Sequence, residues 1–305
     1  MFLKPTVTMG NLPIYNTKFG VFVASPQWNR WMVWVAVMWV AYILLHYALG
    51  PLTTEPFFSP VLSMLFVFAV VINVLCVLTT CTDPGILPRM NAGEAEASGF
   101  QKESECQRPN DVLEFVNVAV ANNNVIDQSM CYKCNHLKPR GANHCFVSNA
   151  CIMDMDHYCI ILGCCIGSRN LRWFLLYLFA LSIGGTLGII TTFKGLKGSA
   201  ANGRHHDSVL LIFVTLLAIG GIAVGAVTYF FWKGMYLIWQ GQTTRGLIKK
   251  IAVTTESKKG IEAMKQVMFP PIPSLLPVYF KDFFDNGDDD DDAGENDPLA
   301  NREEM

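Results

Sequence analysis

The apolar residues of this chain fall into four long blocks that polar segments separate. Each block holds about 20 or more mostly apolar residues, the length that a helix needs to cross a hydrocarbon core of about 30 Å. Because every backbone polar group within lipid must be paired inside the protein, a helix is the expected form of each block. We therefore predict an all-α membrane protein with four transmembrane helices. The predicted spans are Trp31–Leu49, Phe57–Thr79, Trp173–Phe193 and Ser208–Trp239.

Positively charged residues predict the orientation of these spans. The segment Gly50–Pro56, between the first two spans, has no Lys or Arg, whereas the N-terminus, the long middle segment and the C-terminal segment each carry several. The loop between the third and fourth spans weakens this signal, because it contains Lys194, Lys197 and Arg204. Since segments rich in Lys and Arg stay in the cytosol, we expect an integral multi-pass protein with both termini and the middle segment cytosolic. The block Ser208–Trp239 is too long for one straight span, so its last turns are expected to leave the membrane.

Composition agrees with a membrane protein and distinguishes an acidic tail. Of the 305 residues, 51% are hydrophobic and 16% are charged, whereas a soluble domain has about a quarter of charged residues. The formal net charge is -2, but residues 285–305 contain ten acidic residues and one Arg, so the rest of the chain is basic. We expect the tail to be disordered and the basic remainder to face the anionic cytosolic surface of the lipid bilayer. No nucleic-acid partner is expected.

Most of the ten cysteines lie in the 35 residues from Cys131 to Cys165, between the second and third spans. In a reducing cytosol such a cluster indicates metal binding or catalysis rather than disulfides. The pair Cys131-x-x-Cys134 can place two sulfurs on one zinc ion, and His144 and Cys151 complete a tetrahedral set. A loop with so little apolar core needs a metal to hold its shape. A reduced loop without metal is the alternative.

Asp156, His157 and Cys159 form a second constellation close to the zinc set. A free cysteine has a pKa of about 8.5, so most of it is thiol at neutral pH. A neighbouring imidazole can accept the thiol proton, and an aspartate can orient the imidazole. The three residues therefore suit thiol-based acyl transfer at a membrane face. Taken alone, they leave open the alternative that His157 or Cys159 is another zinc ligand.

Further motifs surround these residues. Asp83-Pro84-Gly85 follows the second span, and Thr243-Thr244 follows the fourth. In spacing and topology the chain resembles the DHHC protein S-acyltransferases (palmitoyltransferases), whose DPG and TTxE motifs stand at these two places. The reactive tetrapeptide is the DHYC variant, with Tyr158 as its third residue. The loop positions that match the family pattern are Cys131, Cys134, Lys138, Pro139, His144, Cys145, Cys151, Asp156, His157, Cys159, Cys165 and Gly167, followed by Asn170 and Phe174.

The resemblance implies a role for each of the reactive residues. Cys159 would take a fatty acyl group from palmitoyl-CoA as a thioester and pass it to a cysteine of a membrane-associated protein. His157 would be the base, Asp156 would orient it, and Thr244 would support Asp156. The acyl chain would lie in a cavity among the four helices, since a long chain is costly to hold in water. Members of the family reside mostly in Golgi or endoplasmic reticulum membranes, which sets the expected location.

The chain departs from the family pattern at a second zinc set. Family members usually bind two zinc ions, and the second set corresponds here to Cys145, Ser148, Tyr158 and Cys165. A serine has no thiolate and a tyrosine is normally a neutral phenol, so two of these four are poor zinc ligands. We therefore expect one zinc ion, with the second absent or weak. Cys164 is extra to the pattern and is a candidate third ligand of that second set.

Other departures leave an alternative function open. Ile160-Ile161 replaces a Pro-Trp pair, Gly141 an Arg, and Gly246 the Glu of TTxE. With these losses, the chain could be a catalytically weak or inactive membrane scaffold that keeps one structural zinc. A transporter or channel is the third reading. It is disfavoured because ion and proton pathways usually place charged residues within the spans, and the membrane-embedded parts of the predicted spans have none.

These assignments divide the chain into seven parts. They are a cytosolic N-terminus (1–30), the first two transmembrane helices (31–82), a cytosolic linker with the DPG motif (83–130), a cysteine-rich DHYC catalytic module (131–172), the last two transmembrane helices (173–239), a cytosolic segment with the TTxE-like motif (240–284) and the acidic tail (285–305).

Overall fold

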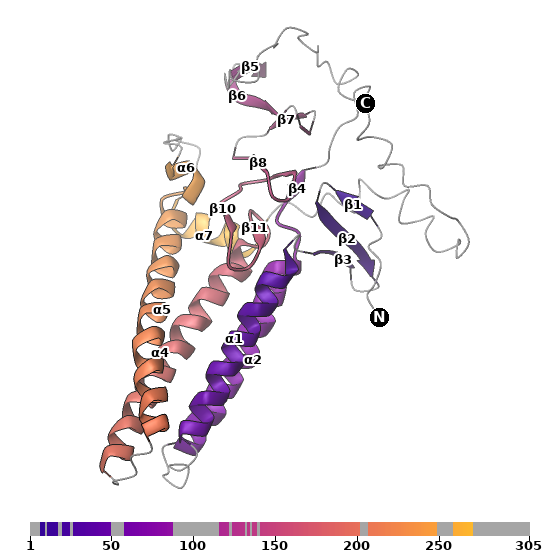
Figure 1. Ribbon diagram of the computed structural model, residues 1–305. Coiled ribbons are helices and arrows are strands. Elements are labelled where there is room, and N and C mark those ends of the chain that lie inside the picture. The colour runs from indigo at the N-terminus through magenta and orange to yellow at the C-terminus, as the bar shows by residue number, and fades with distance from the viewer. Residues whose placement is uncertain are drawn as a thin grey trace, which may run out of the picture.

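Four long helices form the body of the molecule (Figure 1). The computed structural model describes residues 7–9, 11–17, 20–24, 27–49, 58–87, 116–121, 124–131, 133–134, 136–138, 141–201, 207–248 and 259–270. The long helices are α1 (Trp28–Leu49), α2 (Phe58–Cys81), α4 (Leu171–Ala201) and α5 (Asp207–Trp239). Helix α2 packs against α1 and α4, and α5 packs against α4 and α1.

Each long helix contains a stretch long and apolar enough to cross a membrane, so the prediction of four spans is confirmed. Helix α4 continues past the predicted end at Phe193, and Lys197 lies over the Phe193 ring at 4.8 Å. Many apolar side chains point outward from the bundle. Val33 and Ile222, for example, are 64% and 78% exposed. Water would disfavour so much exposed apolar surface, whereas lipid would cover it. The protein is therefore a multi-pass membrane protein.

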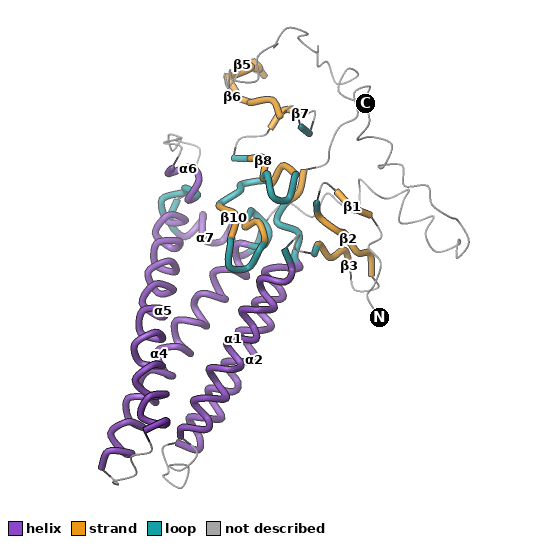
Figure 2. The backbone as a smooth tube through the Cα atoms, in the orientation of Figure 1, coloured by secondary structure: helices purple, strands orange, loops and turns teal. Residues whose placement is uncertain are grey.

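The strands lie at one end of the bundle (Figure 2). Three antiparallel sheets and a hairpin are present in the described part of the chain. An N-terminal sheet contains β1 (Val7–Met9), β2 (Leu12–Thr17) and β3 (Gly20–Val23). A second sheet contains β4 (Ile86–Leu87), β9 (Ala150–Ile152) and β8 (Asn143–Cys145). A third contains β5 (Val116–Ala121), β6 (Asn124–Cys131) and β7 (His136–Lys138), and β10 (His157–Cys159) with β11 (Cys164–Ile166) forms the hairpin.

These strands add secondary structure to two of the predicted segments. The N-terminal 30 residues were predicted only as a cytosolic segment, yet β1 to β3 form a sheet there. Residues 116–131 fall almost wholly within the predicted linker, yet β5 and β6 pair along their length. Both segments alternate apolar and polar residues over short runs. This pattern indicates strands, but it is a weaker signal than the long apolar blocks of the helices. Residues 88–115 and the acidic tail at 285–305 lie outside the described residues.

A tight turn attaches the cysteine-rich segment to the end of α2. Asp83 Oδ1 accepts the backbone N–H groups of Gly85 at 2.8 Å and Ile86 at 2.9 Å, which closes the turn. Gly85 has a φ of +103°, which favours glycine. A Cβ atom on Gly167 would lie 2.4 Å from the Pro84 carbonyl oxygen, so the chain before α4 approaches this turn closely. The DPG motif is therefore a structural junction.

Asn170 fastens the same junction from the side of α4. The side chain is 1% exposed, and its amide donates to the carbonyl oxygens of Thr79 at 3.0 Å and Cys165 at 2.9 Å. Its amide oxygen accepts the N–H of Gly167 at 2.9 Å. One buried side chain thus pairs three backbone groups from α2, β11 and the turn before α4, which fixes the β10–β11 hairpin on the bundle.

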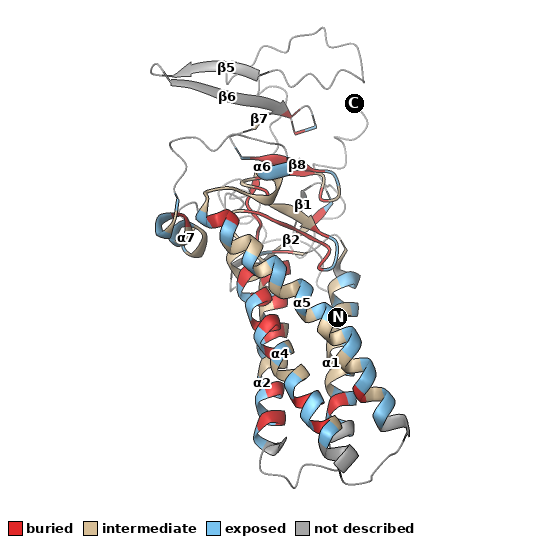
Figure 3. Cartoon of the chain, turned by 90° about the vertical axis from the view of Figure 1, so that its left-hand side faces the viewer, coloured by how far each residue is buried: buried red, intermediate tan, exposed pale blue. Residues whose placement is uncertain are grey.

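Two short helices complete this end of the molecule (Figure 3). They are α6 (Thr244–Ile248) and α7 (Ile261–Met268). Helix α7 packs against α5 and α4, and Arg172 Nη1 donates to the Met268 carbonyl oxygen at 3.2 Å. Four residues separate the end of α5 from the start of α6, and the first turn of α6 contacts the cysteine-rich segment.

Candidate active site and metal centre

Strand β10 divides its residues between two faces. Side chains alternate along a strand, so His157 and Cys159 point to one side and Tyr158 to the other. Cys159 packs in a cluster with residues of the helices, whereas Tyr158 packs against the N-terminal sheet. The hairpin register pairs Cys159 with Cys164 and Tyr158 with Cys165, so the same division continues on β11.

Asp156, His157 and Thr244 form a continuous hydrogen-bond chain. His157 Nδ1 lies 2.7 Å from Asp156 Oδ2, and the backbone N–H of Thr244 donates to Asp156 Oδ1 at 2.6 Å. The carboxylate is therefore held from both sides. Asp156 is 12% exposed in its side chain, so these charge-assisted bonds lie in a partly dry environment where they are strong.

The environment favours the protonated imidazole of His157. Burial opposes the charge, but the hydrogen bonds with Asp156 and Cys159 outweigh it and raise the pKa of His157 to about 9. Burial also acts to raise the pKa of Asp156, yet its hydrogen bonds with His157 and Thr244 hold that pKa below its usual value. Because Asp156 occupies Nδ1, Nε2 is the ring nitrogen left to exchange a proton with a neighbouring thiol.

The first turn of α6 explains the TTxE-like motif in physical terms. Thr243 precedes the helix, and its Oγ1 accepts the N–H of Gly246 at 3.0 Å, which is the bond of a helix N-cap. A Glu three residues after the N-cap residue accepts the backbone N–H of that residue, which completes a capping box. Gly246 has no side chain to do so. The chain therefore keeps half of the cap that positions the Thr244 N–H.

Cys159 lies at the junction between the hairpin and the bundle. It is 8% exposed and packs in a cluster with Ile72, Leu178 and Leu181. The ring of Phe174 stands edge-on to His157, with centroids 5.2 Å apart. Below it, Trp34 Nε1 donates to the Tyr177 hydroxyl. The nucleophile candidate thus faces an aromatic and aliphatic interior to which all four long helices contribute.

The two residues after Cys159 point outward. Ile160 and Ile161 are 67% and 57% exposed, and Arg30 Nη1 donates to the Ile160 carbonyl oxygen at 3.1 Å. They form the tip of the β10–β11 hairpin, beside the first turn of α1. The position of the family's Pro-Trp pair is therefore an exposed apolar tip in this chain.

The first cysteine set has the geometry of a zinc site. His144 Nδ1 lies 3.5 Å from Cys131 Sγ, 3.4 Å from Cys134 Sγ and 3.9 Å from Cys151 Sγ. Zn–S and Zn–N bonds of about 2.3 and 2.0 Å in a tetrahedron place sulfur and nitrogen about 3.5 Å apart. All four ligand atoms lie within 4.8 Å of one another, and the three sulfurs are buried. The donor set therefore fits a structural zinc ion.

The second set, Cys145, Ser148, Tyr158 and Cys165, does not have the geometry of a metal site. Cys165 Sγ lies 2.7 Å from Cys145 Sγ, and Ser148 Oγ lies 3.3 Å from Cys165 Sγ. The Tyr158 hydroxyl instead donates to Gln27 Oε1 at 2.9 Å. Cys164 belongs to the cluster around Cys159, on the opposite face of the hairpin, so its suggested role as a third ligand is wrong.

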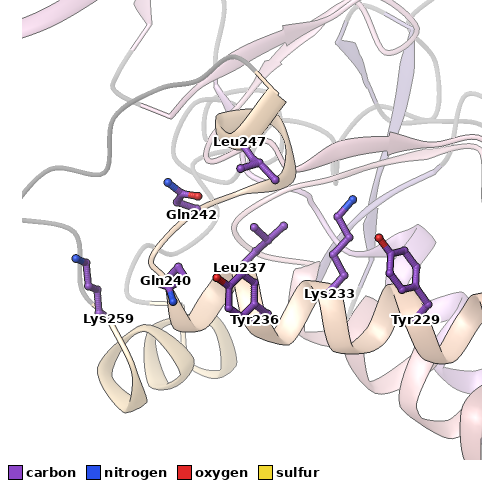
Figure 4. Close-up of a pocket in the computed structure, with 8 residues that line it drawn as sticks. All are labelled: Tyr229, Lys233, Tyr236, Leu237, Gln240, Gln242, Leu247 and Lys259. Carbon is purple, nitrogen blue, oxygen red and sulfur yellow. The ribbon is translucent and has the colours of Figure 1, made fainter.

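A more polar pocket lies beside the last turns of α5 (Figure 4). Lys233 and Lys259 line it together with tyrosine, glutamine and leucine side chains, and none of Asp156, His157 and Cys159 does. It is therefore not the cavity that an acyl chain attached to Cys159 would occupy. The other residues of its lining are Tyr229, Tyr236, Leu237, Gln240, Gln242 and Leu247.

The structure adds details that residue types do not reveal. Thr244 contacts Asp156 through its backbone N–H, a group that every residue except proline carries. Gln27 lies outside every recognised motif, and its contact with Tyr158 depends on the fold of a distant segment. Asn170 matches the family pattern, but its three buried bonds appear only when the helix ends are in place.

Comparison with known proteins finds similarity to palmitoyltransferases. Residues 124–251 match the family model of the DHHC palmitoyltransferase. The chain is 31% identical over 210 residues to Palmitoyltransferase ZDHHC9 of Danio rerio, covering 61% of this chain and 49% of the relative. It is 34% identical over 149 residues to Palmitoyltransferase ZDHHC18-B of Danio rerio, covering 46% of this chain and 36% of the relative. With Palmitoyltransferase ZDHHC7 of Mus musculus the identity is 26% over 260 residues, or 80% of this chain and 75% of the relative.

Two of these matches cover half of the relative's length or less. The chain spans about half the length of ZDHHC9 and about a third of that of ZDHHC18-B. The shared region nevertheless includes the cysteine-rich loop, the last two long helices and the start of α6. Residues 124–251 therefore correspond to the DHHC palmitoyltransferase domain, and the chain is similar to palmitoyltransferases over this region.

Proposed function

We propose that this protein is a protein S-acyltransferase. It would move a palmitoyl or other long-chain acyl group from acyl-CoA through a thioester on Cys159 to cysteines of membrane-associated proteins. The observation that carries the proposal is the chain from the Thr244 N–H through Asp156 to His157, on the strand that also bears Cys159. A nucleophile, a base and an orienting carboxylate in that order are the requirements of acyl transfer through a thiol.

In the first step, Cys159 would attack the thioester carbonyl of acyl-CoA. The neutral form of His157 takes the thiol proton at Nε2, Sγ forms a bond to the carbonyl carbon, and the bond from that carbon to the CoA sulfur breaks. The protonated His157 then gives its proton to the departing CoA thiolate. Asp156 stabilises the imidazolium during the exchange, which agrees with the raised pKa of His157. The products are the acyl-enzyme and free CoA.

In the second step, a cysteine of the protein substrate would attack the acyl carbon. Its thiol proton passes to His157, a new thioester forms, and the bond to Cys159 Sγ breaks. The proton returns to Cys159 and regenerates the enzyme. The acyl chain would extend from Cys159 into the apolar cluster below it, where Trp34, Phe68 and Phe231 contribute from three helices. Burial there offsets the cost of holding a long chain outside lipid, about 0.8 kcal/mol per methylene.

Zinc would stabilise the fold of the site and take no part in the reaction. Cys131, Cys134, His144 and Cys151 are the residues that would hold it, as their mutual distances support. A bound ion supplies a fixed tetrahedral crosslink in a segment that has little core of its own. Cys151 belongs to β9 and the Cys159 hairpin follows it, so the crosslink steadies the strands that lead to the nucleophile.

The basic segments favour an orientation with both termini and the site in the cytosol. The site, the N-terminal sheet, α6 and α7 share one end of the bundle (Figure 1), and Arg30, Lys138, Arg169 and Arg172 belong to that end. Acyl-CoA is a cytosolic metabolite, so the orientation agrees with the reaction. A Golgi or endoplasmic reticulum membrane is the location that we propose.

Acyl labelling of the purified full-length protein tests the function. The protein in detergent is incubated with a palmitoyl-CoA analogue, and wild type is compared with Cys159→Ser, with and without hydroxylamine. A label that hydroxylamine removes and that the variant lacks supports an acyl-enzyme on Cys159. An unlabelled wild type that still carries zinc and elutes as a folded protein would instead support the inactive scaffold. That reading draws on Gly246, Ile160-Ile161 and the missing second zinc ligands.

A further inference from the structure

Two buried cysteines outside the zinc and acyl-transfer residues lie unusually close together. Cys145 ends β8 and Cys165 lies in β11, so they belong to two separate sheets. Their sulfur atoms are 2.7 Å apart, and each residue is 3% exposed. The pair occupies the place where the family pattern predicts the second zinc site.

The sulfur separation disagrees with a shared metal ion. Two sulfurs on one tetrahedral zinc lie about 3.8 Å apart, because each Zn–S bond is about 2.3 Å. A disulfide bond is about 2.05 Å, so the pair needs to close by only about 0.7 Å to form one. The other two positions of the set provide no thiolate, since Ser148 offers a hydroxyl and Tyr158 donates its own to Gln27.

The surroundings of the pair are packed with apolar side chains. Leu12, Ile14 and Val23 of the N-terminal sheet lie in one buried cluster with Ile152 and the two cysteines. These strands fill the space around the sulfurs. Ser148 contributes a buried hydroxyl beside Cys165, and the cluster around the pair is otherwise hydrophobic, which suits a neutral crosslink.

We propose that Cys145 and Cys165 are a disulfide-forming pair that replaces the second metal crosslink of this fold. Hydrogen peroxide, or another peroxide, is the oxidant. It oxidises one thiol to a sulfenic acid and releases water, and the second thiol then displaces the hydroxyl group as another water while the S–S bond forms. The two sulfurs lose two electrons, which the peroxide gains. The product ties the β10–β11 hairpin covalently to the β8–β9 sheet.

The other cysteines of the segment have different surroundings. Cys164 is adjacent to Cys165 in sequence but lies on the face of Cys159, in the other cluster. Cys131, Cys134 and Cys151 form the zinc set. We therefore expect the disulfide bond to join Cys145 and Cys165 specifically. Its formation does not depend on acyl transfer.

Peptide mapping of the full-length protein tests this. Purified zinc-loaded protein is treated with dilute hydrogen peroxide, denatured with an excess of N-ethylmaleimide and digested without reduction. We expect the loss of two alkylatable thiols, a peptide pair linked through Cys145 and Cys165, recovery of both thiols with dithiothreitol, and unchanged zinc content. The link should be absent in Cys145→Ser and kept in the matched control Cys164→Ser.

Three outcomes would overturn the proposal. Both thiols could stay alkylatable at peroxide concentrations that oxidise exposed thiols. The linked peptides could instead join Cys159 to Cys164. Finally, two zinc ions per chain, one of which Cys145→Ser removes, would assign the pair to a metal. The first measurement uses wild-type protein, so the result does not depend on whether a variant folds.

Discussion

Replacing Thr244 with Pro would remove the backbone N–H that donates to the Asp156 carboxylate, together with the side-chain hydroxyl, and leave the start of α6 intact. Thr244 is the first residue of α6, where proline is well tolerated because its fixed φ suits a helix start. Thr243 before it is the N-cap, whose extended backbone is compatible with a following proline. The lost group is the N–H that donates to Asp156 Oδ1 at 2.6 Å.

The size of the effect follows from the kind of bond. A hydrogen bond to a charged group contributes about 1.5–3 kcal/mol. Asp156 is 12% exposed, so water can replace part of the bond and the lower half of that range applies. If the bond holds Asp156 and His157 in the reactive arrangement, a loss of about 1.5–2 kcal/mol slows acylation about 10- to 30-fold.

Thr244→Ala is the matched control, because it keeps the N–H and loses the hydroxyl that also contacts Asp156. Both variants lack the hydroxyl, so the ratio of their acyl-labelling rates isolates the backbone donor. Rates are measured as single-turnover labelling with a palmitoyl-CoA analogue, alongside thermal denaturation in detergent. Equal rates for the two variants, at equal stability, would refute a role for the Thr244 N–H in positioning Asp156.

Four further outcomes are expected. Purified protein should carry about one zinc per chain by elemental analysis, and Cys131→Ser or His144→Ala should release it; two tightly bound ions would contradict the assignment of the second set. Gly246→Glu should complete the capping box and stabilise α6 by about 0.5–1 kcal/mol, which would raise both thermal stability and labelling rate, and no gain in either would mean that α6 is already fixed. Asn170→Ala leaves three buried backbone groups unpaired at about 1–3 kcal/mol each, so thermal stability should drop strongly while zinc stays bound. The pKa of His157 rises from 6.5 to about 9 on folding, so its stabilising contribution is full below pH 6.5 and disappears as pH rises through about 9; wild type should lose stability over that window relative to His157→Gln, and parallel curves would exclude the ion pair.

The spans were predictable because their signal is strong and local. A run of about 20 apolar residues seldom occurs outside a membrane-spanning helix. Helices α1, α2 and α5 end within two residues of the predicted ends, whereas α4 continues eight residues further, to Ala201. The zinc set and the Asp156–His157–Cys159 group were also visible, because short spacings within one loop limit how far apart their side chains can lie. The structure brings both groups together as the spacing suggested, and the roles that we assign to them await the labelling and metal measurements.

The N-terminal sheet was not predictable from the same signals. Its strands are three to six residues long, and their burial depends on a surface that the cysteine-rich segment supplies. A short alternating run gives weak evidence when its partner lies more than a hundred residues away. The bonds from Gln27 to Tyr158 and from Arg30 to Ile160 have the same origin, because each joins segments that only the folded chain brings together.

The two faces of β10 place different demands on mutation. His157 and Cys159 share the side that faces the helices, while Tyr158 between them faces the N-terminal sheet. A substitution at the middle position can therefore exchange a metal ligand for a packed phenol without moving the nucleophile or its base. The face that carries Tyr158 can change in sequence as long as other side chains pack against it, and here the N-terminal sheet supplies them. Chemistry and support can thus evolve separately within three consecutive residues.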